Sequence, residues 1–180
     1  MKTYKFLAAG AKGPITGFQW PLPQLEAAGE WVEAGGPLEA CGRGAHVCRP
    51  RELAFWIHDE LWEVEVDGAQ IEGYDCLVAE RARLVRRIED WQRGGAARFA
   101  NACLERAAAS VAQAASEQRA AVASYLEDAE WAAGEARAAE TAFCAALVVA
   151  KLGGVPVDAA FRQERFWQAG YIARVVVGEG

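Results

Sequence analysis

Hydrophobic and charged residues alternate through LWEVEV, residues 61–66, with the tryptophan and valines on one side and the glutamates on the other. Since successive strand side chains point to opposite faces, the pattern predicts a half-buried β-strand, with a turn at Asp67-Gly68. Further extended segments are expected at TYKFLA, GFQWPLP, GEWVEA, GAHVC, YDCLVAE and RLVRRIEDW. Pro50 suits the first turn of a short helix, PRELAFWIHDE.

Two oppositely charged runs lie close together in this half of the chain. The acidic run Asp59 to Asp67 precedes the basic run Arg81 to Arg87. If the two form neighbouring antiparallel strands, the arginines face the glutamates and their charges largely cancel. We prefer this interpretation to an anion-binding site.

The second half is rich in alanine, which makes up 27 of the last 90 residues, and it has neither Gly nor Pro between Gly95 and Gly134. Alanine favours helix, so one long helix is expected there. Residues spaced alternately by four and three would form one stripe along it, to which a partner helix could pack closely. The members of this predicted interface seam are Leu104, Ala108, Val111, Ala115, Gln118, Val122, Tyr125 and Ala129.

Two more helices are expected, from Glu135 to Leu152 and after Asp158. The sequence therefore predicts an α+β protein with two parts. Residues 1–91 would form a small mixed or antiparallel sheet with one short helix. Residues 92–180 would form an alanine-rich helical bundle, closely packed on the sheet or on a second copy.

Composition excludes several classes of protein. The net charge of -6 is unsuited to nucleic acid, which needs a basic surface. No apolar run approaches the roughly 20 residues that span a bilayer, so no membrane association is expected. Five cysteines, an odd number scattered through both halves, indicate reduced thiols and a cytoplasmic protein.

The segment CGRGAHVCRP, residues 41–50, gathers the residues with most chemical potential. Cys41, His46 and Cys48 could bind zinc, with Cys76 or His58 as a fourth ligand. The spacing is unusual and the chain has no Cys-x2-Cys pair, so we favour a tight turn leading into a half-buried strand. Cys48 would then be a small buried hydrophobe and His46 would bond to backbone.

A cysteine nucleophile is a second hypothesis for the same segment. Cys48 and His46 would point the same way on a strand and could touch, but nothing marks an orienting acid. Cys103 and Cys144 lie among helical alanines, where core packing is expected.

A G-x-H-x-C motif is followed by a short helix, then by a strand that ends in E-V-E-V-D-G, and then by a strand rich in arginine. In this order of its elements the chain resembles uncharacterised domains of high-GC bacteria. Over residues 40–90 this order of elements is also similar to part of the ADP-ribosyltransferase fold. The resemblance implies that His46 contacts NAD or an ADP-ribose group, with Arg43 or Arg49 near its phosphates. Glu80 and Glu89 are candidates for the catalytic glutamate by position only.

Two functions are compatible with these patterns. The favoured one is a non-catalytic binding or assembly protein, which uses its alanine-rich helical surface to bind itself or a protein partner. The alternative is a nucleotide-binding or ADP-ribosyl-transferring enzyme with a cleft beside His46. The cofactor is unknown, with NAD and zinc as alternatives.

Overall fold

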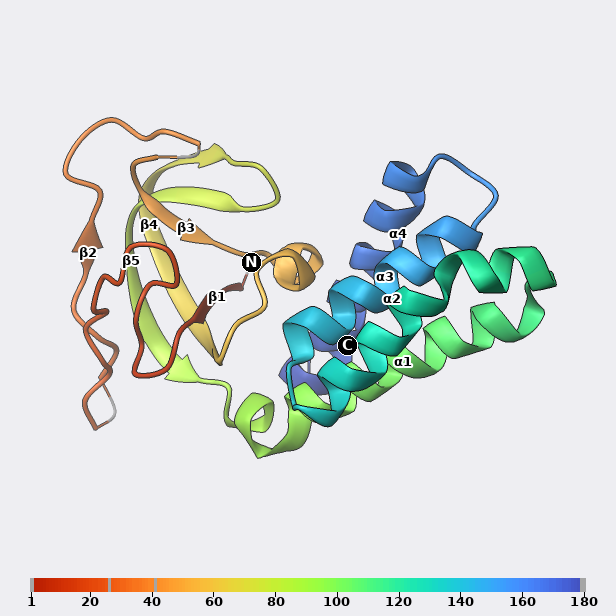
Figure 1. Cartoon of the computed structure of the whole chain (residues 1–180). Helices are drawn as coiled ribbons and strands as arrows, with labels where there is room; N and C mark the ends of the chain where they lie inside the picture. The colour runs from red at the N-terminus through yellow and green to blue at the C-terminus, as the bar shows by residue number, and fades with distance from the viewer. Residues whose placement is uncertain (1, 26, 41, 179–180) are drawn as a thin grey trace.

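A computed structural model describes residues 2–25, 27–40 and 42–178, and it places the strands and the helices in separate halves (Figure 1). The strands are β1 (Thr3–Leu7), β2 (Val32–Glu33), β3 (Ala45–Val47), β4 (Glu60–Glu72) and β5 (Leu77–Arg87). The α-helices are α1 (Ala96–Gln113), α2 (Ser116–Gly134), α3 (Ala138–Leu152) and α4 (Val157–Tyr171). Three short helical segments are η1 (Pro50–Phe55), η2 (Trp91–Gly95) and η3 (Ile172–Val177). The predicted α+β class is confirmed.

The sheet is antiparallel and strongly curled. Its order is β1-β4-β5-β2, and β3 pairs with the part of β5 that β2 leaves uncovered. Tyr4 and Cys48 exchange two backbone hydrogen bonds, of 2.8 and 2.6 Å, which bring the end of β3 back to β1. The small sheet thereby almost closes on itself.

The predicted pairing of the acidic and basic runs is confirmed. They form β4 and β5, and their side chains make a ladder of ion pairs across the two strands. Glu63 pairs with Arg86 at 2.7 Å, Glu65 with Arg83 at 2.6 Å, and Asp67 with Arg81.

The turn predicted at Asp67-Gly68 is wrong. β4 continues to Glu72, and the register shifts between Asp67 and Gln70, where Gly68 has a φ of +78°. A glycine with positive φ suits a β-bulge as well as a turn, so the sequence could not separate the two. The chain reverses later, where the Gly73 amide donates to the Cys76 carbonyl at 3.0 Å.

The single long helix predicted from Gly95 to Gly134 is also wrong. Ala114 and Ala115 have extended backbone, with ψ of 153° and 157°, and the chain turns there into two helices, α1 and α2, that lie side by side (Figure 1). Within the described residues the bundle therefore has four α-helices rather than three. A long straight helix would leave most of its apolar side chains in water, and folding back buries them.

The two halves share one hydrophobic core. It joins Tyr4, Leu53 and Leu61 of the sheet half to Phe99 and Ile172 of the helical half. η1 lies between the sheet and the helices and provides much of this contact (Figure 1). A second core, around Trp20 and Trp62, fills the other face of the sheet. In the part of the chain that the structure describes, no helix is both long and apolar enough to cross a membrane.

Candidate functional site

The segment that contains His46 forms β3 and the turn before it. The two imidazole nitrogens of His46 contact backbone carbonyls, Nδ1 that of Gly44 at 3.1 Å and Nε2 that of Ala40 at 3.2 Å. Cys48 is buried, and Cys41 lies outside the described residues. Among the described residues, no three His, Cys, Asp or Glu side chains are grouped closely enough to hold a metal ion.

The arginines expected to bind phosphate beside His46 have other contacts. Arg49 bonds to Glu52 at 2.8 Å and to Glu72 at 2.7 Å, and these carboxylates raise the pKa of its guanidinium. The Arg43 side chain packs against Gly36. Neither of the two shallow hollows described on residues 2–25, 27–40 and 42–178 is lined by Arg43, His46 or Arg49. The nucleotide site stays a prediction, without a described cavity to support it.

The cysteines have the properties of packing residues. Burial raises the pKa of the Cys48 thiol far above its usual range, and raises that of Cys103 to about 12. Burial also raises the pKa of Cys144. These three thiols are therefore protonated at neutral pH, and a protonated thiol is a poor nucleophile.

The predicted interface seam is divided between α1 and α2. Val122 and Ala129 are buried inside the bundle, so they are not accessible to a partner. Leu104, Val111 and Tyr125 are half-buried, and Ala108, Ala115 and Gln118 are exposed. The seam is thus not one continuous surface, and any role in association stays a prediction.

A different surface brings together the two halves of the protein and exposes large aromatic rings. It consists of Phe55 at the end of η1, Tyr74 and Asp75 in the β4–β5 turn, and Arg162 and Phe166 on α4. We call it the aromatic–arginine surface. Tyr74 is 71% exposed and Phe166 41% exposed, a high exposure for rings of this size.

Arg162 is the centre of the aromatic–arginine surface. Its guanidinium carbon lies 5.6 Å from the ring centre of Phe55 and 5.5 Å from those of Tyr74 and Phe166. The same guanidinium donates through both of its terminal nitrogens to the Asp75 carboxylate. Planar guanidinium groups stack on rings and pair with carboxylates in this way. The charge of Arg162 is therefore neutralised and its side chain is held in place.

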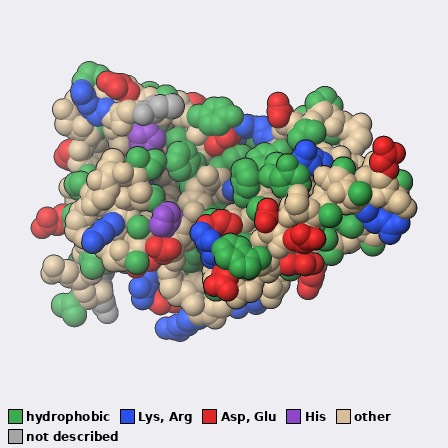
Figure 2. All heavy atoms as spheres, in the orientation of Figure 1, with side chains coloured by type: hydrophobic (Ala, Val, Ile, Leu, Met, Phe, Trp, Pro, Cys, Tyr) green, Lys and Arg blue, Asp and Glu red, His purple; other side chains and the backbone are tan. Residues whose placement is uncertain are grey.

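The exposed hydrophobic area continues onto α3. Phe143 of α3 meets Phe161 of α4 edge to face, with ring centres 5.4 Å apart, and Phe143 is half exposed. Val157, at the start of α4, is also exposed. Figure 2 shows hydrophobic side chains gathered over α3 and α4 on this face of the molecule.

Buried polar contacts fix α4 beneath the surface. The Arg165 guanidinium donates to the Ala54 carbonyl of η1 and, at 2.8 Å, to the Gln168 side chain. Gln168 in turn donates to the Ala142 carbonyl of α3 at 2.8 Å. α4 is thus bonded to both of its neighbours, which sets the positions of Arg162 and Phe166.

Sequence reasoning did not find the aromatic–arginine surface. The spacing of Arg162 and Phe166 by four residues places both on one side of a helix, and this was a usable signal. Phe55 and Tyr74 come from segments more than 80 residues earlier, and only the docking of η1 and the β4–β5 turn on α4 brings them there.

The fold and this surface define an α+β protein with an exposed aromatic face at the junction of its two halves. No family model, curated protein or solved structure matches the chain.

Proposed function

We propose that the protein is a non-catalytic binding protein, which attaches to a partner protein through the aromatic–arginine surface and Phe143 of α3. The observation that carries the proposal is the exposure of Tyr74 and Phe166 around an arginine that is already stacked and paired.

Two physical arguments support this function. Tyrosine, tryptophan and arginine dominate the binding energy of protein interfaces. Aromatic rings offer a large contact area with few rotatable bonds, and arginine adds a planar guanidinium group that stacks and forms hydrogen bonds. Here Asp75 and three rings hold Arg162 before any partner arrives, so little side-chain entropy is lost on binding. The Arg162–Asp75 pair carries no net charge, so the surface suits a partner that presents apolar side chains.

A photo-crosslinking pair tests which helical surface is used. A benzophenone amino acid replaces Phe166 in one protein and the exposed Ala108 of α1 in another, and both are irradiated in cells of the source organism. We expect cross-linked species with Phe166→benzoylphenylalanine only. Cross-links at position 108 alone would favour the predicted seam, and their absence at both positions would contradict the proposal.

Substitutions supply the second test. Phe166→Ser and Arg162→Ala should each weaken non-covalent binding of the partner that cross-linking identifies by at least about tenfold, as expected for central interface residues. Trp131→Ala is the matched control, because Trp131 is also exposed and stacked on an arginine, Arg137, but lies on α2. An equal loss with Trp131→Ala would mean that the aromatic–arginine surface has no special role.

A further inference from the structure

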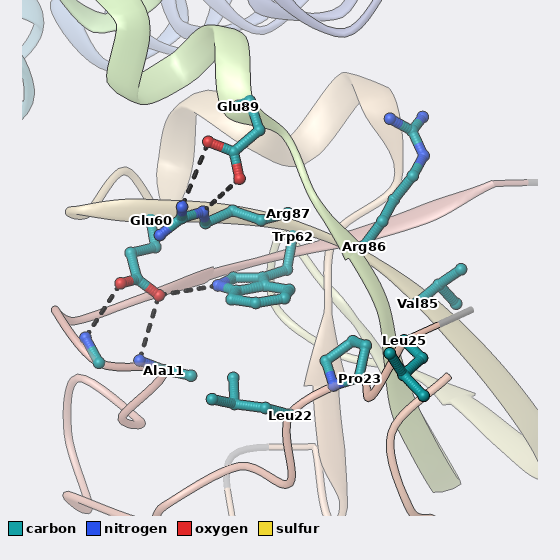
Figure 3. A pocket seen from close by; sticks show the side chains of 11 residues that line it. Ala11, Leu22, Pro23, Leu25, Glu60, Trp62, Val85, Arg86, Arg87 and Glu89 are labelled. Atoms are coloured by element: carbon teal, nitrogen blue, oxygen red, sulfur yellow. Dashed lines mark hydrogen bonds and ion pairs between the residues drawn. The ribbon is translucent and has the colours of Figure 1, made fainter. Parts of the chain in front are cut away.

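A hollow of about 460 Å³ lies on the sheet half, between the segment that links β1 to β2 and the ends of β4 and β5 (Figure 3). Its larger apolar lining residues are Leu22, Pro23, Trp62 and Val85, with Leu25 at the edge. In Figure 3 the indole ring of Trp62 lies at the centre of the lining side chains, with Leu22 and Pro23 across from it. This volume is large enough for one or two apolar side chains.

Glu60 at one side of the hollow has its hydrogen-bonding capacity filled from within the protein. Its carboxylate accepts bonds from the amides of Gly10 at 3.0 Å and Ala11 at 3.1 Å, and from the Trp62 indole at 2.9 Å. These contacts hold the segment after β1 against the sheet. Glu60 therefore shapes the wall of the hollow and is not a free anion within it.

The arginines at the rim are paired as well. Arg87 donates to Glu89 at 2.8 Å, and Arg86 lies 2.7 Å from Glu63 (Figure 3 shows the first of these pairs). Each of these arginines already has a carboxylate partner, and Glu60 is held by three neutral donors of the protein itself. An apolar occupant fits this lining better than a charged ligand, which would have to break one of these pairs.

Leu25, at the rim of the same hollow, is a fully exposed leucine on a strained backbone. It lies between Gln24 and Ala27, which exchange two backbone hydrogen bonds of 3.1 and 2.9 Å, and its φ is +54°. Leucine seldom adopts a positive φ, where glycine and asparagine are readily accommodated. Neither the exposed leucine side chain nor the strained backbone stabilises the isolated chain. A function for the leucine would explain both.

We propose that two copies of the chain pair about a twofold axis on this face, with Leu25 of each copy inserted into the hollow of the other. A twofold interface needs a projection and a matching recess on the same face of one molecule, and Leu25 lies beside the hollow. Glu63 and Glu89 neutralise Arg86 and Arg87, so the arginines of two identical faces would not repel each other. None of the residues of the aromatic–arginine surface lines this hollow, so that surface stays free for its own partner.

Sedimentation equilibrium of the purified chain tests the pairing with two variants. Leu25→Asn removes the apolar projection and suits the positive φ, so it should weaken the dimer about a hundredfold without lowering the thermal stability of the monomer. Leu22→Trp should fill the hollow and weaken the dimer similarly. A mixture of the two variants can form one correct contact, and should associate more tightly than either variant alone.

The outcomes separate this inference from the proposed function. A monomer at all concentrations, or a dimer unaffected by Leu25→Asn, would overturn the pairing and leave the proposed function standing. A dimer lost with Phe166→Ser but kept with Leu25→Asn would assign self-association to the aromatic–arginine surface instead. Loss with Leu25→Asn and partial recovery in the mixture would establish the contact.

Discussion

Glu164 is a buried carboxylate of α4, and it pairs with Arg106 of α1, whose Nε lies 2.9 Å from both carboxylate oxygens. Burial raises the pKa of the Glu164 carboxyl above its ordinary value, and the arginine only partly opposes this. The folded state therefore holds the Glu164 proton more tightly than the unfolded chain does. The stability that this group contributes is greatest below its unfolded pKa, and it is lost as the pH rises through the folded pKa.

Glu164→Gln removes this titration and gives a test with a definite sign. The free energy of unfolding of the wild type relative to the variant should fall as the pH rises above the ordinary pKa of a glutamate, measured by urea unfolding at each pH. The exposed carboxylates of Asp67, Glu72 and Glu89, whose pKa values are lowered by arginines, contribute equally in both proteins and cancel. A constant or rising difference would contradict the buried, proton-retaining state of Glu164.

The thiols provide a second prediction at the residue scale. Cys48 and Cys103 are buried with raised pKa values, so iodoacetamide at about pH 8 should modify them at least a hundredfold more slowly in the native protein than in urea. Cys144, which is half-buried, should react first of these three. Peptide mass spectrometry gives each rate, and rapid native modification of Cys48 would revive the nucleophile hypothesis.

At the scale of the elements, the break between α1 and α2 can be tested directly. Ala115 has the extended backbone of a helix N-cap, and its side chain offers no hydrogen-bond acceptor to the first turn of α2. Ala115→Ser should therefore stabilise the protein by about 0.5–1 kcal/mol. In a continuous helix the same change would destabilise it by about 0.5 kcal/mol, as we expect for the control Ala123→Ser at an exposed position within α2. Urea unfolding of both variants decides between the two.

Sequence patterns predicted the elements whose evidence is local. The β4–β5 pairing was predicted from two local patterns. These are the alternation in LWEVEV and the opposite charges of residues 59–67 and 81–87, and both are visible in the sequence of the strands themselves. Gly68 was misread because a positive φ serves a bulge as well as a turn. The break at Ala114 was missed because both neighbours are good helix formers, and only burial of the helix faces favours the reversal.

The candidate site was less predictable than the fold because it depends on tertiary packing, as the break at Ala114 does. His46 was a candidate because histidine is a common catalytic and metal-binding residue. In the structure its two ring nitrogens contact backbone carbonyls. The aromatic–arginine surface is assembled from η1, the β4–β5 turn and α4, and no window of sequence contains it. Tyr74 and Arg162 meet only after the two halves have docked.

At the scale of the whole molecule, the core shared by the two halves predicts that they unfold together. Leu53 of η1 is completely buried in the shared core, and Leu84 of β5 is completely buried in the second core on the far face of the sheet. Truncating either leucine to alanine should lower the free energy of unfolding by about 2–5 kcal/mol. The two substitutions test the docking of the halves because Leu53 belongs to the core shared with the helices, whereas Leu84 belongs to the second core.

We expect one cooperative transition in the wild type and in both variants, since loss of the sheet would expose the apolar face of η1 and α4 together. Helical circular dichroism reports mainly on residues 96–171, and tryptophan fluorescence mainly on the sheet half, where most of the seven tryptophans lie. The two signals should change at the same urea concentration in each protein. If Leu84→Ala instead shifted the fluorescence transition and left the helical one in place, the halves would be independent domains. The aromatic–arginine surface, which needs both, would then lose its fixed geometry.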